Sequence, residues 1–211
     1  MFITFEGPDG SGKTTQARIL ADRLVHGGRD VLMTREPGGT PVAEKIRDIL
    51  LCETEEEIAG ETEALLYAAA RSQLVRHVIR PALARGQIVV CDRFVDSSLV
   101  YQGEARHLGW ERVRTLNEGA LDGLRPDLTF VLEVPAREAF ARMGAAGRSG
   151  DRMEDGGCGF QESIREGYRK LVAREPGRYV VLDGLRPPGE TAEKIWIRVQ
   201  GRLGAPSGDI L

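Results

Sequence analysis

Cysteine is scarce in the 211-residue sequence, which holds only Cys52, Cys91 and Cys158, far apart from one another. No CxxC pair occurs, so the pattern indicates neither a disulfide framework nor a zinc site, and Cys91 is expected to be a small buried hydrophobic residue. No apolar run approaches the roughly 18 residues that a membrane span needs. The first expected strand begins at once, which leaves no room for a signal peptide. These absences predict a cytoplasmic protein that has no membrane partner.

A strong charge bias is also missing. The net charge is −3, which argues against a polyanion such as DNA as the main partner. A hydrophobic content of 41% and a charged content of 29% are ordinary for a globular protein. There is no internal repeat and no linker-like stretch, so the chain is expected to form one domain over residues 1–211, with a frayed tail over 204–211.

Short apolar runs alternate with helical patterns along the chain. The runs that predict buried strands cover residues 1–5, 30–34, 87–91, 128–134 and 179–183. Helical patterns are expected over 16–24, 42–51, 63–83, 96–101, 110–120, 137–143, 160–174 and 191–203. This alternation predicts an α/β fold with a parallel five-stranded sheet and helices on both faces. Ligands of such sheets bind beyond the carboxyl ends of the strands.

The turn after the first expected strand contains a phosphate-binding motif. Its residues Gly7, Gly12, Lys13 and Thr14 match G-x-x-x-x-G-K-[ST] between a strand and a helix. Glycines let backbone N–H groups converge on phosphate oxygens, and the helix N-terminus adds partial positive charge. Lys13 can reach the β- and γ-phosphates, and the Thr14 hydroxyl can bind Mg²⁺. The motif predicts a P-loop NTPase fold and a nucleoside triphosphate ligand. The triphosphate-binding residues are expected to be Gly7, Pro8, Asp9, Gly10, Ser11, Gly12, Lys13 and Thr14.

Arginines and a glycine-rich segment narrow the reaction class. Arg35, Arg71 and Arg93 are expected near the active edge of the sheet, where guanidinium groups suit phosphate and the charge of a transferring phosphoryl. The stretch over about 142–157 has the composition of a lid, and lid closure excludes water from phosphoryl transfer. These features favour a small-molecule phosphotransferase over a hydrolase. A GTPase is disfavoured because no N-K-x-D motif is present.

Several separated stretches resemble one family, the bacterial thymidylate kinases. They are FEGPDGSGKTTQ (5–16), TREPGGT (34–40), EALLYAAAR (63–71), DRFVDSSLVYQG (92–103) and DRME (151–154), with Phe160, Gly167 and Tyr168 beyond them. The P-loop is common to many families, whereas the second and fourth stretches are far more specific. The resemblance spans nearly the whole chain and implies transfer of the γ-phosphoryl of ATP to dTMP, giving dTDP, with Mg²⁺ as cofactor.

The resemblance also implies a role for individual residues. Catalytic roles are implied for Lys13, Arg93, Asp9, Arg148 and Arg152, the last two as lid arginines. Thr14 and Asp92 would lie at the Mg²⁺ shell. The dTMP site would comprise Asp9, Glu36, Tyr67, Arg71, Arg93, Ser97, Ser98, Tyr101 and Gln102.

Within that site, Arg93 would hold the dTMP phosphate, and Arg71 would hydrogen-bond thymine. Tyr67 would stack on the base, since residues i and i+4 share a helix face. Tyr101 would crowd the 2′ position of the sugar and so disfavour a ribonucleotide.

The sequence departs from the family at Tyr67, where many members have phenylalanine, and at Ala70, where many have an acidic residue. Stacking is expected to survive because the phenol ring keeps its π-face. The family is usually homodimeric, and the apolar helix near residues 65–78 fits a subunit contact or a buried place within one subunit. Two alternatives stay open: another nucleotide or nucleoside kinase, and a P-loop switch that controls a partner protein.

Overall fold

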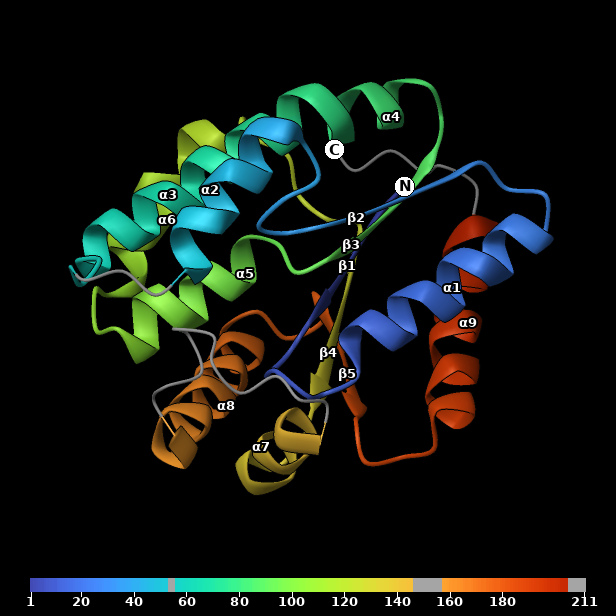
Figure 1. The fold of residues 1–211 in the computed structure, drawn as a ribbon. Helices are drawn as coiled ribbons and strands as arrows, with labels where there is room; N and C mark the ends of the chain where they lie inside the picture. The colour runs from blue at the N-terminus through green and yellow to red at the C-terminus, as the bar shows by residue number, and fades with distance from the viewer. Residues whose placement is uncertain (53–55, 146–156, 205–211) are drawn as a thin grey trace.

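The sheet is built from the five apolar segments that the sequence predicts. The structure is a computed structural model that describes residues 1–52, 56–145 and 157–204. The strands are β1 (Phe2–Glu6), β2 (Val31–Arg35), β3 (Ile88–Asp92), β4 (Leu128–Glu133) and β5 (Tyr179–Asp183). They form one parallel sheet in the order β2-β3-β1-β4-β5 (Figure 1). The first three strands each end one residue later than predicted, so Glu6, Arg35 and Asp92 are terminal strand residues.

Helices cover both faces of this sheet, which confirms the predicted α/β architecture. Those of the described residues are α1 (Lys13–His26), α2 (Pro41–Leu51), α3 (Gly60–Leu74), α4 (Arg80–Ala84), α5 (Val95–Ser98), α6 (Trp110–Leu121), α7 (Ala136–Ala145), α8 (Gly157–Arg174) and α9 (Pro188–Gly204), with π-helical segments η1 (Val75–Ile79) and η2 (Leu99–Ala105). In Figure 1, α1 and α9 lie on one side of the strands, and α2, α3, α5, α6 and α8 lie on the other.

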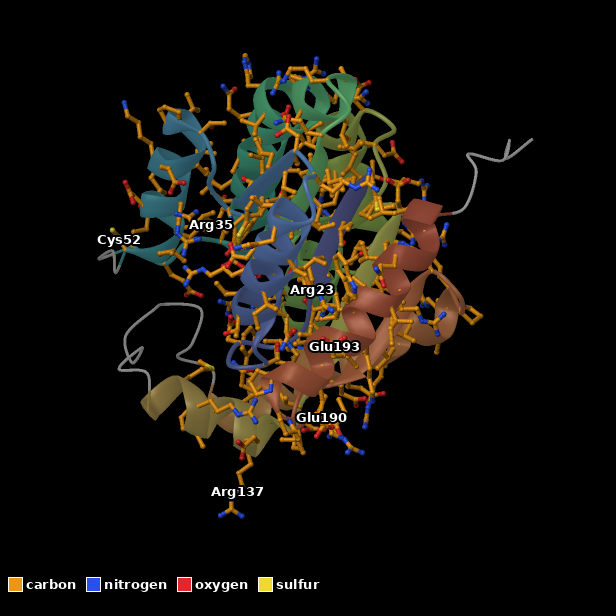
Figure 2. All side chains as sticks on the ribbon, turned by 90° about the vertical axis from the view of Figure 1, so that its right-hand side faces the viewer. Arg23, Arg35, Cys52, Arg137, Glu190 and Glu193 are labelled. Carbon is orange, nitrogen blue, oxygen red and sulfur yellow. The ribbon has the colours of Figure 1, made fainter. Side chains whose placement is uncertain are left out.

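Alternate strand residues supply the two halves of the core. On one face, Ile3, Phe5 and Phe130 pack with Leu20 and Leu24 of α1 and with residues of α9. Helices α1 and α9 are also joined at the surface by an ion pair of 2.6 Å between Arg23 and Glu193, whose side chains meet in Figure 2.

On the opposite face, strand residues pack against the helices that line the functional edge. The cluster around Phe2 and Val89 includes Leu74 and Ile79, and the cluster around Val131 includes residues of η2, α6 and α8. Burying each large aliphatic or aromatic side chain contributes roughly 1.5–3 kcal/mol, so both layers are held firmly on the sheet.

The long helix predicted over residues 63–83 is continuous but not uniform. Its middle turn, η1, is π-helical, and the backbone N–H of Arg80 donates to the carbonyl of Val75, five residues earlier. Pro81 follows directly; it lacks an N–H, and its ring would clash with the carbonyl of His77 in a regular α-helix. A π turn is a known way to absorb such a break.

A second π segment changes the predicted helix over residues 96–101. The helix begins at Val95 and continues through η2 to Ala105, where the N–H of Arg106 donates to the carbonyl of Tyr101. The extra residue in the turn brings Tyr101 and Gln102 both into buried positions.

The proline- and glycine-rich stretch between β2 and α2, residues 36–40, is irregular, and its last residue, Thr40, caps α2 by accepting a hydrogen bond of 3.1 Å from the Ala43 N–H. Most of the predicted lid over about 142–157 and nearly all of the predicted tail lie outside the described residues. Among the helices that the structure describes, none combines the length and the apolar character needed to cross a membrane.

Candidate active site

The P-loop connects the carboxyl end of β1 to the N-terminus of α1. Gly7 has φ +135°, and a Cβ atom there would lie 2.4 Å from the carbonyl oxygen of Leu132. Gly10 has φ +75°, and its Cβ would lie 2.5 Å from the carbonyl oxygen of Ala139. Only glycine combines these backbone angles with this close approach. Gly12 precedes the helix, so Lys13 and Thr14 lie in the first turn of α1.

Lys13 is a buried cation in this loop. Its side chain is only 5% exposed, and Nζ donates a hydrogen bond of 2.6 Å to the carbonyl of Pro8. Burial, reinforced by the nearby guanidinium of Arg93, lowers the pKa of Lys13 to about 8 against the attraction of Asp9, Asp92 and Glu6. An anion beside Nζ would favour the charged form again, so the site is suited to a phosphate.

Thr14 and Asp92 form the best-placed group for a divalent cation. The Thr14 hydroxyl donates to Oδ2 of Asp92, while Oδ1 of Asp92 is buried and has no hydrogen-bond partner among the described residues. A hydroxyl and a carboxylate are oxygen ligands of the kind that Mg²⁺ prefers, and Mg²⁺ takes its other ligands from water and substrate phosphates. In the described parts of the chain, no group of three or more His, Cys, Asp or Glu side chains forms a larger metal site. The donor set therefore fits a cation bound with a nucleotide.

Arg93 follows β3 and points across the P-loop. It has φ +71°, an unusual conformation for a residue other than glycine, and such strain is common at functional sites. Nη2 donates to Oδ1 of Asp9 at 2.5 Å and to the Tyr101 hydroxyl at 3.0 Å. Nη1 donates to the Gly7 carbonyl at 3.2 Å and to Oγ of Ser97 at 3.0 Å.

Electrostatics bind this cluster together. Burial opposes the charge of Asp9, yet Arg93 and Lys13 outweigh it and hold the pKa of Asp9 far below its usual value. Burial also opposes the charge of Arg93, and Asp9 outweighs it, so the pKa of Arg93 is raised well above normal. The Tyr101 hydroxyl donates to Oδ2 of Asp9 at 2.8 Å. Burial and the charge of Asp9 raise the pKa of Tyr101 well above its ordinary value, although Arg93 acts in the opposite direction. Asp9 and Arg93 are therefore a fixed ion pair across the physiological range.

Arg71 lies in a second cluster, 1% exposed at the carboxyl-terminal half of α3. Its Nε and Nη2 both donate to Oε2 of Glu36, at 2.8 and 2.5 Å. The remaining N–H groups reach Ser98, Asn117 and the carbonyl of Phe94. Burial raises the pKa of Glu36, and Arg71 partly offsets that rise. Oε1 of Glu36 is buried, and no residue in the described part of the chain donates a hydrogen bond to it.

Both clusters line a single cavity of about 750 Å³. Predicted site residues on its wall are Asp9, Gly10, Gly12, Lys13, Thr14, Glu36, Tyr67, Arg71, Asp92, Arg93, Ser97, Ser98, Tyr101 and Gln102. Tyr67 lies four residues before Arg71 on α3 and is partly buried. Gln102 is buried and donates a hydrogen bond of 2.9 Å to Glu63, so its amide is already oriented.

Some predicted residues are not brought to this wall. Gly7, Pro8 and Ser11 belong to the loop but not to the lining of the cavity, and Arg148 and Arg152 lie outside the described residues. The neighbouring Arg142 does line the cavity, where Nη1 donates to the carbonyl of Gly184 at 2.9 Å and Nε to Glu138 at 2.8 Å.

Sequence reasoning missed several residues of the site. Arg18 and Arg47 line the cavity but are single arginines on helices, without a local motif. Asn117 of α6 accepts a hydrogen bond from Arg71, although it lies 46 residues further along the chain. Glu6 and Tyr168 contact the residues around Arg93 from beneath the loop. Two signals were available: Glu6 ends an otherwise apolar strand, and both Glu6 and Tyr168 belong to the stretches that carry the family resemblance.

Comparisons with known proteins identify the family of this chain. The family model "Thymidylate kinase" matches residues 5–195. A thymidylate kinase of Desulforudis audaxviator is 50% identical over 204 residues, covering 96% of this chain and 91% of that protein. One of Bacillus pumilus is 44% identical over 204 residues, covering 96% of each. The crystal structure of thymidylate kinase from Ehrlichia chaffeensis matches with a TM-score of 0.75 at 31% identity, covering 95% of this chain and 98% of that one. The chain therefore belongs to the thymidylate kinase family and carries its activity, the phosphorylation of dTMP to dTDP by ATP.

Proposed function

We propose that the single cavity holds both substrates of this reaction, the ATP phosphates at the P-loop and dTMP between Arg93 and Arg71. The observation that carries the proposal is that one cavity of about 750 Å³ is lined by Lys13, Arg93 and Arg71 together. Its two ends differ in chemistry. One end is a glycine-rich loop at a helix N-terminus, which suits a polyphosphate, and the other is a buried polar pocket beside an aromatic ring.

At the donor end, the phosphates would lie against the backbone of residues 7–14, namely Gly7, Pro8, Asp9, Gly10, Ser11, Gly12, Lys13 and Thr14. Lys13 would exchange its hydrogen bond with the Pro8 carbonyl for oxygens of the β- and γ-phosphates. Thr14 and Asp92 would hold Mg²⁺, and the free Oδ1 of Asp92 supports this assignment. The bound ion would neutralise phosphate charge and orient the γ-phosphoryl group.

At the acceptor end, Arg93 would hold the dTMP phosphate next to the donor. Its guanidinium is already aimed by Asp9, Ser97 and Tyr101, so little ordering is needed on binding. Direct in-line transfer needs positioning and charge neutralisation more than a general base, because the acceptor phosphate is already ionised. Asp9 would act by fixing Arg93 rather than by taking a proton.

Thymine would stack on Tyr67 and accept a hydrogen bond from Arg71. All five N–H groups of Arg71 already have protein acceptors, so the base would share one of them. Ser98, Gln102 and Glu36 would complete the pocket, with Ser97 beside Arg93. Oε1 of Glu36, which has no partner within residues 1–52, 56–145 and 157–204, is an acceptor that a substrate donor could use. Tyr101, held by Asp9 and Arg93, would restrict the 2′ position of the sugar.

Arg148 and Arg152 are proposed to supply positive charge from a lid over residues 142–157, next to Arg142. The whole of residues 1–211 is proposed to act as one kinase domain in the cytoplasm. A homodimer through α2 and α3 is also proposed. Its support is the exposure of Val42, Ile49 and Leu65, each about half exposed on these two neighbouring helices. Sedimentation of the wild type and of Leu65→Glu tests it: a wild type that sediments as a monomer contradicts the dimer.

A coupled assay of ADP release tests the assignment of substrates and residues. With ATP and Mg²⁺, dTMP should stand out among dTMP, dUMP, dCMP, dAMP, dGMP, AMP and CMP. Lys13→Ala and Arg93→Ala should lower turnover by at least a hundredfold while the circular dichroism spectrum is kept. Arg112→Ala serves as the matched control, because Arg112 forms an exposed ion pair with Glu61 and does not line the cavity. Near-normal turnover of either variant contradicts its role.

The same assay separates the alternatives. Another nucleotide kinase would prefer a different monophosphate in the panel. A P-loop switch would hydrolyse ATP slowly, and no nucleoside monophosphate would stimulate it.

A further inference from the structure

Beneath the P-loop lies a buried carboxylate that does not line the cavity. Glu6 is the last residue of β1, directly before Gly7, and its side chain is fully buried. A buried carboxylate is costly unless several donors surround it. Its neighbours therefore indicate what it does for the site.

Three donors from three segments converge on Glu6. The backbone N–H of Phe94 donates to Oε1 at 2.8 Å. The Ser97 hydroxyl of α5 and the Tyr168 hydroxyl of α8 both donate to Oε2, at 2.6 and 2.9 Å. Glu6 thus ties the end of β1 to the loop after β3 and to α8.

Two of these three bonds, those of Phe94 and Ser97, act on Arg93. Phe94 is the next residue in the chain, and the N–H of Arg93 itself donates to the carbonyl of Phe5, the neighbour of Glu6. The backbone of Arg93, with its φ of +71°, is therefore clamped on both sides by β1. Its side chain is clamped too, because Nη1 donates to the same Ser97 oxygen that donates to Glu6.

The charges have a matching arrangement. Arg93 and Lys13 are two cations close enough that Arg93 depresses the pKa of Lys13. Asp9 pairs with Arg93 from the cavity wall, and Glu6 lies on the side of the sheet, linked to Arg93 through Ser97. Arg93 is thus held between a carboxylate that substrates can reach and one that they cannot.

We propose that Glu6 is a positioning residue for phosphoryl transfer, which holds the backbone and guanidinium of Arg93 in place through the Phe94 N–H and the Ser97 hydroxyl. This inference rests on the proposed role of Arg93 in binding the dTMP phosphate. Tyr168 supports the same carboxylate and brings α8, the helix that follows the proposed lid, into contact with this anchor.

The variant Glu6→Gln tests this inference because it keeps the shape and removes the charge and one acceptor. We expect the KM for dTMP to rise and kcat to fall, each at least tenfold, with less than a threefold change in the KM for ATP. A purely structural role would lower kcat by the unfolded fraction and leave both KM values unchanged. That result would overturn the proposal.

The matched control is Asp96→Asn, which alters another fully buried carboxylate nearby. After burial, the Asp96 charge is the main cause that raises the pKa of Glu6, so its removal should leave Glu6 more readily ionised and its three hydrogen bonds in place. Asp96 accepts from Arg178 at 2.8 and 2.9 Å and from Tyr179, and none of these bonds involves Arg93. We expect this variant to lose stability and to keep both KM values within threefold of wild type. A dTMP defect equal to that of Glu6→Gln would mean that any buried charge in this region matters equally, against the proposal.

A double-mutant cycle identifies the route of the effect. If Glu6 acts through Arg93, adding Glu6→Gln to Arg93→Ala should change kcat/KM for dTMP less than threefold; fully additive losses would refute it. Near-normal activity of the Arg93→Ala variant would instead contradict the proposed role of Arg93 in holding dTMP. If Glu6→Gln fails to fold, Tyr168→Phe decides: it should raise the KM for dTMP three- to tenfold, and an unchanged value refutes the inference.

Discussion

Removing the Arg71 guanidinium should destabilise the fold as well as the acceptor pocket. Arg71 and Glu36 are a fully buried ion pair, with side chains 1% and 4% exposed. Arg71→Ala leaves Glu36 without its cation and takes a donor from Ser98, Asn117 and the Phe94 carbonyl. Breaking a buried pair by removing one partner costs about 3–5 kcal/mol, a large share of the roughly 5–15 kcal/mol that stabilises a typical domain.

The loss should depend on pH, and its sign follows from Glu36. Burial raises the pKa of Glu36 above its ordinary value, and Arg71 partly offsets the rise. Without Arg71 the pKa in the folded state rises further. A carboxyl group whose folded pKa is raised contributes stability below its unfolded pKa, and that contribution is lost as the pH rises. The deficit of Arg71→Ala should therefore be larger at pH 8 than at pH 5.

Urea unfolding followed by circular dichroism measures this difference. Arg112→Ala is the matched control, because the Arg112–Glu61 pair has a similar distance of 2.6 Å but side chains 58% and 47% exposed. It should cost less than about 1 kcal/mol. The double variant Arg71→Ala, Glu36→Gln should recover at least about 1 kcal/mol of the loss at pH 8. An Arg71→Ala deficit no larger than that of the control would refute the reasoning.

Three further predictions concern the P-loop. Gly7→Ala should lower the free energy of unfolding, measured in urea, by at least about 2 kcal/mol, because its Cβ would lie 2.4 Å from the Leu132 carbonyl oxygen. The control is Gly86→Ala, which is also at positive φ but has open space around it. It should lower the free energy of unfolding by only about 1 kcal/mol. Burial and Arg93 lower the pKa of Lys13 to about 8, so the free energy of unfolding of the wild type should rise with pH between about 8 and 10.5. Lys13→Met should abolish that rise. The variant should also be more stable than the wild type at pH 7, by an amount on the order of 2 kcal/mol in urea unfolding. Burial and Asp96 raise the pKa of Glu6 to about 7, against the opposing effects of Ser97, Arg93 and Tyr168. The stability that Glu6 contributes should therefore fall as the pH rises from about 5 to 7. Glu6→Gln should remove this dependence of stability on pH, and an unchanged dependence contradicts the raised pKa of Glu6.

The sheet was predictable because its strands carry their signal locally. Near-continuous apolar runs bounded by glycine and charged residues are typical of buried parallel strands, and the observed ends differ from the expected ones by at most one residue. The helices were harder to delimit. Pro81 forces the π turn at η1, and the tertiary packing of η2 extends the helix after Asp92-Arg93-Phe94 beyond its predicted end. Periodicity alone does not distinguish an α turn from a π turn.

The site was predictable where chemistry and spacing occur together in one segment. The P-loop is recognisable from its glycines, its lysine and its position between a strand and a helix. The structure places Lys13 and Thr14 in the first turn of α1. Asn117 and Glu6 could not be found in this way, because their meaning depends on contacts with residues 46 and 88 positions away. Each looks locally like an ordinary polar residue of a helix or a strand end.

The ladder between β1 and β3 explains why these distant segments form one site. Phe5 pairs in register with Asp92, so the residue after each of them, Glu6 and Arg93, emerges at the same edge of the sheet. The P-loop and Arg93 are thus fixed relative to each other by backbone hydrogen bonds, and the Arg93 N–H continues the ladder to the Phe5 carbonyl. A shift of one residue in this register would move Arg93 by about 3.3 Å along the strand and break its contacts with both Asp9 and Ser97. The proposed transfer between two substrates needs much finer precision than that, so we expect the hydrogen-bonded pairing of β1 with β3 to contribute to catalysis by positioning the P-loop and Arg93.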